Sequence, residues 1–172
     1  MSLAAIAFGV LAVAHAQSAD TPTPSIARED LKMPRQIVSL TLDDARRIIA
    51  AGERQAIELK IPYNIAVVDA GGGLIAHVRM DGAWLGSVDI AIDKAWSARA
   101  FDMPTDALAQ ITQPGQQGFG LNTTNQCRVV IFGGGIPVKV DGTVIGAVGA
   151  SGGSVEQDIS VARAAVAGMK LS

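Results

Sequence analysis

The residues best suited to chemistry lie close together between positions 74 and 81. His77 and Arg79 are two positions apart there, so a strand would place both side chains on one face. An imidazole can ligate a metal or transfer a proton, and a guanidinium binds a carboxylate through two parallel hydrogen bonds. Met80 adds a soft sulfur and Asp81 a carboxylate where the strand should end. This stretch predicts a ligand-binding strand end, with a structural histidine beside a solvated strand end as the alternative.

Two further cations follow on the next expected helix. Lys94 and Arg99 both project from it, beyond the turn that begins at Asp81. If Lys94 faces the strand end that carries Arg79, the two cations form a basic pocket for the carboxylates of a ligand. A salt bridge between this helix and the strand end is the structural alternative.

Two glycine-rich loops supply backbone rather than side chains. Gly133, Gly134 and Gly135 stand between two expected strands, where a missing side chain lets a ligand or another chain contact the backbone. A bulge or wide turn is the alternative. Ser151 and Gly152 precede a helix N-terminus, whose free N–H groups favour an anion. Acidic side chains in the first turn of that helix can also serve the helix dipole. The glycine spacing matches no nucleotide-binding motif.

Cysteine usage and charge exclude several classes of protein. The chain has 172 residues and one cysteine, Cys127, so it forms no intrachain disulfide and no cysteine-based zinc site. We expect Cys127 to be a small buried residue at the start of a strand. Lys and Arg total 14 against 16 Asp and Glu. This near-neutral balance argues against a nucleic-acid partner, which requires a basic surface.

The N-terminal residues have the pattern of a signal peptide. Residues 3–14 form an apolar run shorter than the roughly 20 residues that a membrane-spanning helix needs. Ala14-His15-Ala16 then gives the small-x-small pattern of a cleavage site. We therefore predict that residues 1–16 are a signal peptide and that the protein is periplasmic or secreted, with no membrane span in the mature chain. A buried or frayed N-terminal helix is the alternative.

The remaining sequence predicts a linker followed by one domain. Residues 17–36 are polar and interrupted by prolines, which indicates a linker or arm, and residues 37–172 form the domain. Periodicity and turn residues predict helices over 42–60, 87–101 and 105–111 and from Ser154 onward, strands over 64–69, 74–80, 128–132, 136–140 and 143–150, and a long loop over 112–127. Tight turns at Ala70-Gly71-Gly72-Gly73 and Asp141-Gly142 indicate antiparallel hairpins. The fold class is therefore α+β, with a five-stranded, mainly antiparallel sheet in the order αββα(α)βββα.

Two blocks of this sequence resemble a known family. The first, from Ile65 to Ala98, contains VVDAGG, RMDGA and DKA, and the second, from Gly133 to Asp158, contains GGGIPVKVDG and GASGG. Together they are similar to the GlcG/HbpS-like haem-binding family, and to related domains of PduO-type corrinoid adenosyltransferases, over residues 38–169. The resemblance implies a profilin-like sandwich, with helices on both faces of the sheet, that assembles as a homo-oligomer. Residues 114–126 match no family pattern.

The resemblance also implies a ligand and a role. It implies an exported haem-binding protein, active in haem handling or redox sensing rather than as a conventional enzyme. Arg79 and Lys94 are then the expected partners of the haem propionates, and His77 or Met80 is the expected ligand of the haem iron. Asp81 and the two glycine loops complete the expected cofactor-binding residues, namely Gly133, Gly134, Gly135, Ser151 and Gly152.

Two other functions remain open from the residues alone. The strand end at Arg79 and Asp81, together with the glycine loops, can form the pocket of an enzyme or binding protein for a small organic acid in a catabolic pathway. The domain can also be a structural module that assembles without a ligand. Titration with hemin separates these hypotheses, because only the haem-binding protein is expected to produce a Soret band.

Overall fold

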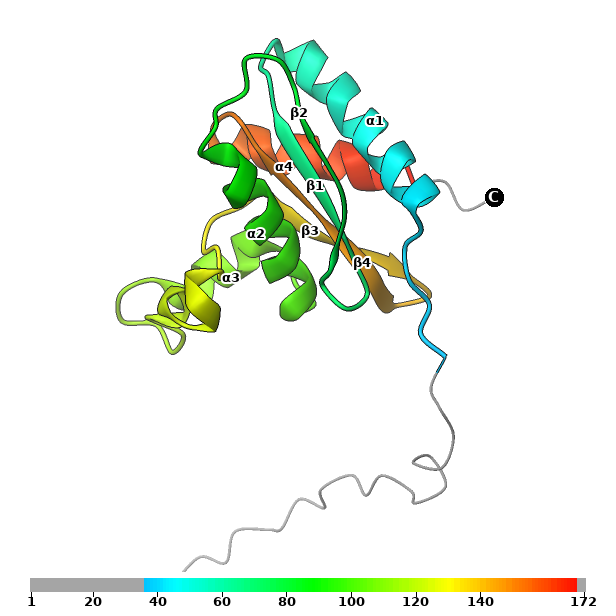
Figure 1. Ribbon diagram of the computed structural model, residues 1–172. Helices are drawn as coiled ribbons and strands as arrows, with labels where there is room; N and C mark the ends of the chain where they lie inside the picture. The colour runs from blue at the N-terminus through cyan, green and yellow to red at the C-terminus, as the bar shows by residue number, and fades with distance from the viewer. Residues whose placement is uncertain (1–35, 170–172) are drawn as a thin grey trace, which may run out of the picture. The chain divides into compact units, whose positions relative to one another are not determined.

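A four-stranded antiparallel sheet forms the centre of the domain in the computed structural model, which describes residues 36–169 (Figure 1). The strands are β1 (Asn64–Asp69), β2 (Leu74–Arg79), β3 (Gly135–Val140) and β4 (Thr143–Ser151), in the spatial order β2-β1-β4-β3. Both predicted hairpins are confirmed, because β1 pairs with β2 and β3 pairs with β4. The predicted signal peptide and residues 17–35 of the predicted linker lie outside the described residues.

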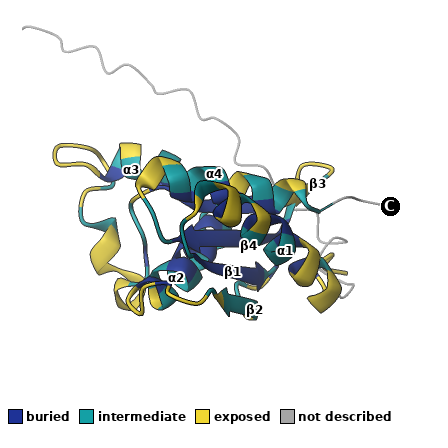
Figure 2. Ribbon diagram, turned by 90° about the horizontal axis from the view of Figure 1, so that it is seen from above, coloured by how far each residue is buried: buried dark blue, intermediate teal, exposed yellow. Residues whose placement is uncertain are grey.

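Helices cover both faces of this sheet. α1 (Leu42–Leu59) and α4 (Val155–Ala167) pack against each other and on one face, and α2 (Ser87–Ala100) packs on the other (Figure 1 and Figure 2). α3 (Thr105–Thr112) and two short 3-10 turns, η2 (Leu121–Thr123) and η3 (Asn125–Cys127), follow α2. An antiparallel sheet with helices on both faces confirms the predicted α+β class.

Between residues 36 and 169, no helix has the length and apolar character needed to cross a membrane.

Reciprocal side-chain caps determine where two of the helices begin. At α1, Thr41 Oγ1 accepts a hydrogen bond from the Asp44 N–H, and the Asp44 carboxylate accepts one from the Thr41 N–H at 2.8 Å. Ser154 and Gln157 form the same arrangement at α4, the helix that the sequence predicted from Ser154 onward. These capping boxes satisfy N–H groups that the first helical turn leaves without partners.

The fifth predicted strand, residues 128–132, is wrong. This segment is irregular and its backbone bonds to a helix instead of a strand: the Val130 N–H donates to Ser97 Oγ at 2.9 Å, and Ser97 Oγ donates to the Arg128 carbonyl at 3.2 Å. Ser97 lies on α2, so α2 holds the segment beside the sheet. Cys127 is also placed differently from the prediction. It lies exposed at the end of a 3-10 turn, with a left-handed φ of 61°.

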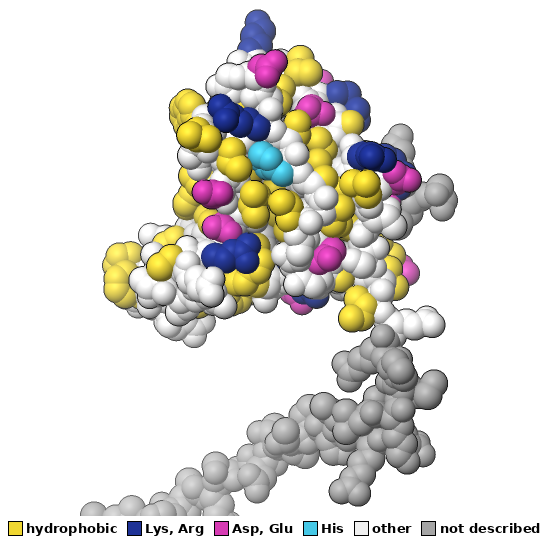
Figure 3. Space-filling view, in the orientation of Figure 1, with side chains coloured by type: hydrophobic (Ala, Val, Ile, Leu, Met, Phe, Trp, Pro, Cys, Tyr) yellow, Lys and Arg dark blue, Asp and Glu magenta, His cyan; other side chains and the backbone are white. Residues whose placement is uncertain are grey.

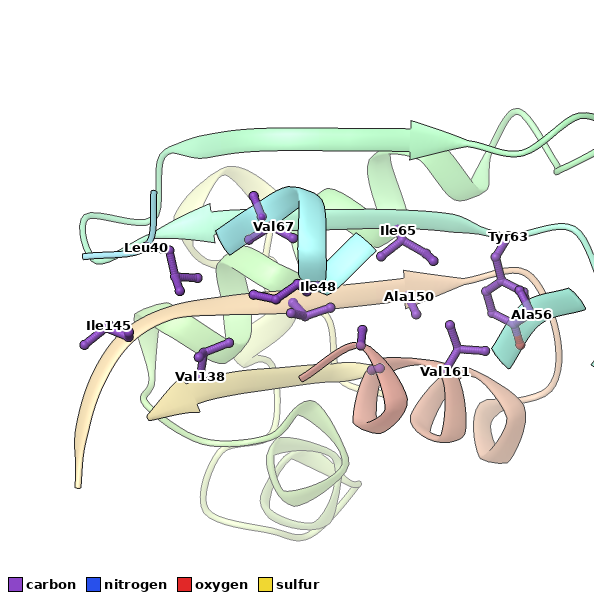
Figure 4. Close-up of a cluster of buried hydrophobic side chains, with 14 residues drawn as sticks. Leu40, Ile48, Ala56, Tyr63, Ile65, Val67, Val138, Ile145, Ala150 and Val161 are labelled. Carbon is purple, nitrogen blue, oxygen red and sulfur yellow. The ribbon is translucent and has the colours of Figure 1, made fainter. Parts of the chain in front are cut away.

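The helices on the two faces differ in how much of the sheet they cover. The larger core fills the space between the sheet and the α1–α4 pair (Figure 4). On the opposite face, small residues allow close packing of α2 on the sheet; they are Ala66, Val68, Ala91, Ala95, Ala98 and Ala147. α2 packs over β4, β1 and β3 and makes few contacts with β2. Figure 2 accordingly shows β1 and β4 as buried and the edge strand β2 as only partly covered.

Candidate functional site

His77 and Arg79 lie on the face of β2 that α2 leaves open. In the antiparallel register His77 is opposite Ala66, and Arg79 is opposite Asn64. Because opposite residues in a sheet share a face, both side chains project on the α2 side. Figure 3 shows the histidine at the surface, with hydrophobic side chains around it. The structure therefore brings together the two residues that the sequence placed on one face of this strand.

A hydrogen-bond chain orients the His77 ring. Asn64 Nδ2 donates to the Trp84 carbonyl at 3.0 Å, so its Oδ1 is free to accept. That Oδ1 lies 3.2 Å from His77 Nε2, which must therefore carry the proton and donate. Burial lowers the pKa of His77 below its ordinary value near 6.5, so the imidazole is neutral at pH 7. The nitrogen that keeps a lone pair is Nδ1.

Arg79 is held by one of its nitrogens and leaves the others available. Its Nε donates to the Ala83 carbonyl at 3.1 Å, and within residues 36–169 the guanidinium has no ion-pair partner. Further along the chain, in the segment between β2 and α2, Trp84 and Leu85 are 68% and 74% exposed. Asp81 is exposed in the turn that precedes them. The open face therefore presents a cation and an imidazole, and two exposed apolar side chains follow in the segment between β2 and α2.

Met80 does not belong to this face. Its Sδ accepts a hydrogen bond from the Tyr63 N–H at 3.4 Å, and its side chain packs against the core between the sheet and α1 and α4. The expectation that Met80 can ligate the same iron as His77 finds no geometric support here, because successive side chains of a strand point to opposite faces.

Lys94 is buried, and the predicted pocket that it shares with Arg79 does not exist. Its Nζ lies 2.5 Å from Asp158 Oδ2 and donates to the Ala150 carbonyl at 3.0 Å, and it sits 4.7 Å from the centre of the Phe132 ring. The side chain is fully inaccessible. Burial lowers the pKa of Lys94, and the Asp158 carboxylate opposes that shift. Lys94 is therefore the internal partner of Asp158 and does not reach a ligand's propionate.

The glycine loops enclose this ion pair. A Cβ on Gly134 would lie 2.8 Å from Lys94 Nζ, and one on Gly135 would strike the Lys94 carbonyl oxygen. From the other loop, the N–H groups of Gly152 and Gly153 donate to Asp158 Oδ1 at 3.1 and 3.0 Å. The anion at the start of α4 is thus the chain's own carboxylate. The small residues in both loops have a structural explanation.

The two other named members of these loops are also used internally. The Ser151 hydroxyl bonds to the Ser87 hydroxyl at 3.2 Å, in the contact of β4 with α2. A Cβ on Gly133 would lie 2.6 Å from the end of the Ile159 side chain on α4. Of the predicted set, Arg79 and Asp81 are exposed and His77, Met80 and Gly152 are half-buried. Met80 and Gly152 make the internal contacts described above.

A cavity of about 430 Å³ that the sequence did not reveal lies between α2 and residues 122–132. Its lining includes Ile90 and the apolar run Val129–Phe132, together with Asp93 and Cys127. The apolar run was predicted to be part of a strand, so its role as one wall of a cavity was not predicted. Cys127 lines this cavity, so a substitution of Cys127 tests whether a ligand binds here instead of on the His77 face.

Buried Tyr63 provides a pH test of the packing around the ion pair. Its hydroxyl has no hydrogen-bond partner among the described residues. Burial, aided by the nearby Asp158 carboxylate, raises the pKa of Tyr63 far above its ordinary value near 10. The phenol ionises near pH 10 only in the unfolded chain, so its contribution to the free energy of unfolding is complete below that pH and falls as the pH rises further.

We expect tyrosinate absorbance to appear only when the protein unfolds at alkaline pH. Tyr63 is the chain's only tyrosine, so the signal reports this one group. Tyr63→Phe should remove the Tyr63 part of the pH dependence above pH 10 and cost little stability, since the lost hydroxyl makes no hydrogen bond to any residue from 36 to 169. Ordinary ionisation near pH 10 with native circular dichroism would contradict the placement of Tyr63.

Fold and site define a small α+β sandwich whose open edge strand carries a histidine and an arginine. Residues 40–167 match the family described as haem degrading protein HbpS-like. The chain therefore belongs to the HbpS-like family, which confirms the resemblance seen in its sequence.

Relatives with known names or structures match most of this domain. An uncharacterized 15.0 kDa protein of Citrobacter freundii is 45% identical over 132 residues, which are 77% of this chain and 93% of that protein. Corrinoid adenosyltransferase PduO of Salmonella typhimurium is 39% identical over 134 residues, which are 78% of this chain and only 40% of PduO. The solved structure of a PduOC:heme complex has a TM-score of 0.73 and 40% identity, and the match covers 76% of this chain and 95% of that one.

Proposed function

We propose that this protein binds haem on the open face of β2, as a haem-handling protein. The observation that carries the proposal is the pair formed by His77 and Arg79 on an uncovered strand, in a member of the HbpS-like family. The similar PduOC domain forms a complex with haem, which supports the same ligand class for this chain. Redox sensing is one use of such binding, because bound haem supplies a redox-active iron.

The residues on this face fit the chemistry of haem. His77 is neutral and has an unprotonated ring nitrogen, as an iron ligand requires. The Nη groups of Arg79 suit a propionate, since among residues 36–169 only its Nε has a hydrogen-bond partner. Trp84 and Leu85 supply exposed apolar surface for the ring. Asp81, by contrast, is an acceptor and has no role toward a carboxylate.

The buried titratable groups of this domain suit a binding protein better than an enzyme. The buried pair of Lys94 and Asp158 is satisfied by internal hydrogen bonds and faces no solvent. The matched part of PduO is less than half of that enzyme, so the name adenosyltransferase does not extend to this domain by similarity. We therefore propose a binding protein as the primary function.

Hemin titration tests this function against its main rival, a protein for small organic acids. That rival is favoured by the Nη groups of Arg79, which have no partner in the described part of the chain and suit any carboxylate. We expect hemin to give a saturable Soret band and to raise the melting temperature, with little effect from acetate, lactate or glycolate at millimolar concentration. Stabilisation by one of these acids and no Soret band would replace haem with an organic acid as the ligand.

Assembly and export are further parts of the proposal. A flat ring on an open face leaves one side in water, and the exposed Trp84 and Leu85 give a second copy an apolar surface to cover. We expect a homo-oligomer of chains that begin at Gln17 in the periplasm or medium. Native mass spectrometry of the exported protein measures both properties. A monomer that retains residues 1–16 would contradict both.

A further inference from the structure

The unassigned residue that most directly controls the open face is Asn64. It lies at the start of β1, fully buried, beneath His77 and opposite Arg79 in the register. A buried amide must satisfy its donors and acceptor within the protein. Asn64 does so with one partner on β2 and another in the segment between β2 and α2.

These two hydrogen bonds have separate consequences. The bond from Asn64 Nδ2 to the Trp84 carbonyl, at 3.0 Å, ties the segment that carries the exposed Trp84 side chain to the sheet. Because that bond sets which end of the amide is Oδ1, the contact with His77 at 3.2 Å requires the proton to be on Nε2. Metal-binding histidines commonly donate their second ring N–H to a carbonyl or carboxylate in this way.

We propose that Asn64 is the positioning residue of the site: it holds His77 as the Nε2–H tautomer, with Nδ1 as the nitrogen offered to a metal, and it fixes the Trp84 segment beside it. This inference rests on the proposed haem-binding function. The arrangement already exists without ligand, so binding does not have to order the ring and the adjoining segment. Arg79 supports the same segment through its bond to the Ala83 carbonyl.

The first test uses the ligand-free protein and needs no haem. In protein labelled with ¹⁵N-histidine, we expect His77 to show a protonated Nε2 whose hydrogen exchanges slowly with water. Asn64→Leu should make that exchange fast, and Asn64→Asp, which keeps the acceptor, should leave it slow. Rapid exchange in the wild-type protein, or protonation at Nδ1, would overturn the proposal even if the variants fail to fold.

The second test is hemin titration of the same variants. Loss of a residue that orients a metal ligand typically weakens affinity by about 10–100-fold, and we expect a loss in this range with an altered Soret band for Asn64→Leu. Asn64→Asp keeps the acceptor for His77 and should keep the wild-type band position, but it cannot donate to the Trp84 carbonyl and should bind hemin more weakly than the wild-type protein. If wild-type protein binds hemin and Asn64→Leu matches it in affinity and spectrum, Asn64 has no positioning role. If wild-type protein does not bind hemin, the haem function fails, and the exchange measurement still decides how Asn64 holds the ring.

Discussion

Replacing Lys94 by methionine is expected to cost about 3–5 kcal/mol of unfolding free energy, the usual cost of removing one partner from a buried ion pair. The methionine side chain fills similar space but leaves Asp158 Oδ2 and the Ala150 carbonyl without their shared donor. Both groups lie out of contact with water, so no solvent replaces the lost hydrogen bonds. Urea unfolding followed by circular dichroism measures the loss.

Two further variants test whether the unpaired buried charge causes the loss of unfolding free energy. Adding Asp158→Asn to Lys94→Met removes the unpaired charge and keeps an oxygen for the Gly152 and Gly153 N–H groups, so we expect a partial return of stability. The exposed pair of Arg46 and Asp43 is the matched control, and Arg46→Met should cost no more than about 1 kcal/mol. If Lys94→Met lowered the unfolding free energy by a similarly small amount, Lys94 and Asp158 would not form a buried ion pair.

Replacing Gly149 by alanine is expected to cost about 3 kcal/mol and to lower the melting temperature by roughly 10 °C. The new methyl group would lie 2.5 Å from the Ala95 nitrogen and would also strike the Ala91 carbonyl oxygen. Both atoms are backbone of α2, which cannot move aside as a flexible side chain can. Overpacking at this position must therefore push α2 away from β4. Thermal unfolding by calorimetry measures the effect.

Gly86 provides the control for this substitution. It stands just before α2 in ordinary helical backbone, with φ of −64°, and a Cβ there meets no atom within 4 Å. Gly86→Ala should be neutral or stabilise the fold by about 0.4–1 kcal/mol through a less flexible unfolded chain. Equal melting temperatures for Gly149→Ala and Gly86→Ala would show that α2 does not press on β4 at this point.

Local signals predicted most of the fold, and they failed where tertiary contacts decide. The predicted helix starts at residue 42 and Ser154 agree with α1 and α4, which Thr41 and Ser154 cap, and Asp141-Gly142 marked the β3–β4 hairpin. Each of these signals acts over a few residues. The run at 128–132 has the composition of a strand, yet Ser97 on α2 takes its backbone hydrogen bonds. No pattern within the run itself could show that.

The site was predictable only where one strand carries it. The two-residue spacing of His77 and Arg79 sufficed to place both on one face of β2. Lys94 was misplaced because its charge suggested a surface position. Its spacing from Ala91 and Ala98 puts it within the buried stripe of α2, and that was the signal that it is internal. Its partner Asp158 lies 64 residues away. Asn64 is opposite Arg79 and reaches His77 only because β1 pairs with β2.

We propose that haem binds at His77 on the open face of β2. The comparison that tests it uses wild-type protein, His77→Ala and Cys127→Ser, since Cys127 lines the cavity on the other side of α2. Hemin is titrated into each protein while the Soret band is recorded.

We expect His77→Ala to bind hemin at least about tenfold more weakly, a difference of about 1.4 kcal/mol, and to shift the Soret maximum, because the axial ligand sets the electronic state of the iron. Cys127→Ser should match the wild-type protein in both respects. Unchanged affinity and an unchanged spectrum for His77→Ala would rule out haem binding at His77, and weaker binding by Cys127→Ser instead would move the site to the cavity beside residues 122–132.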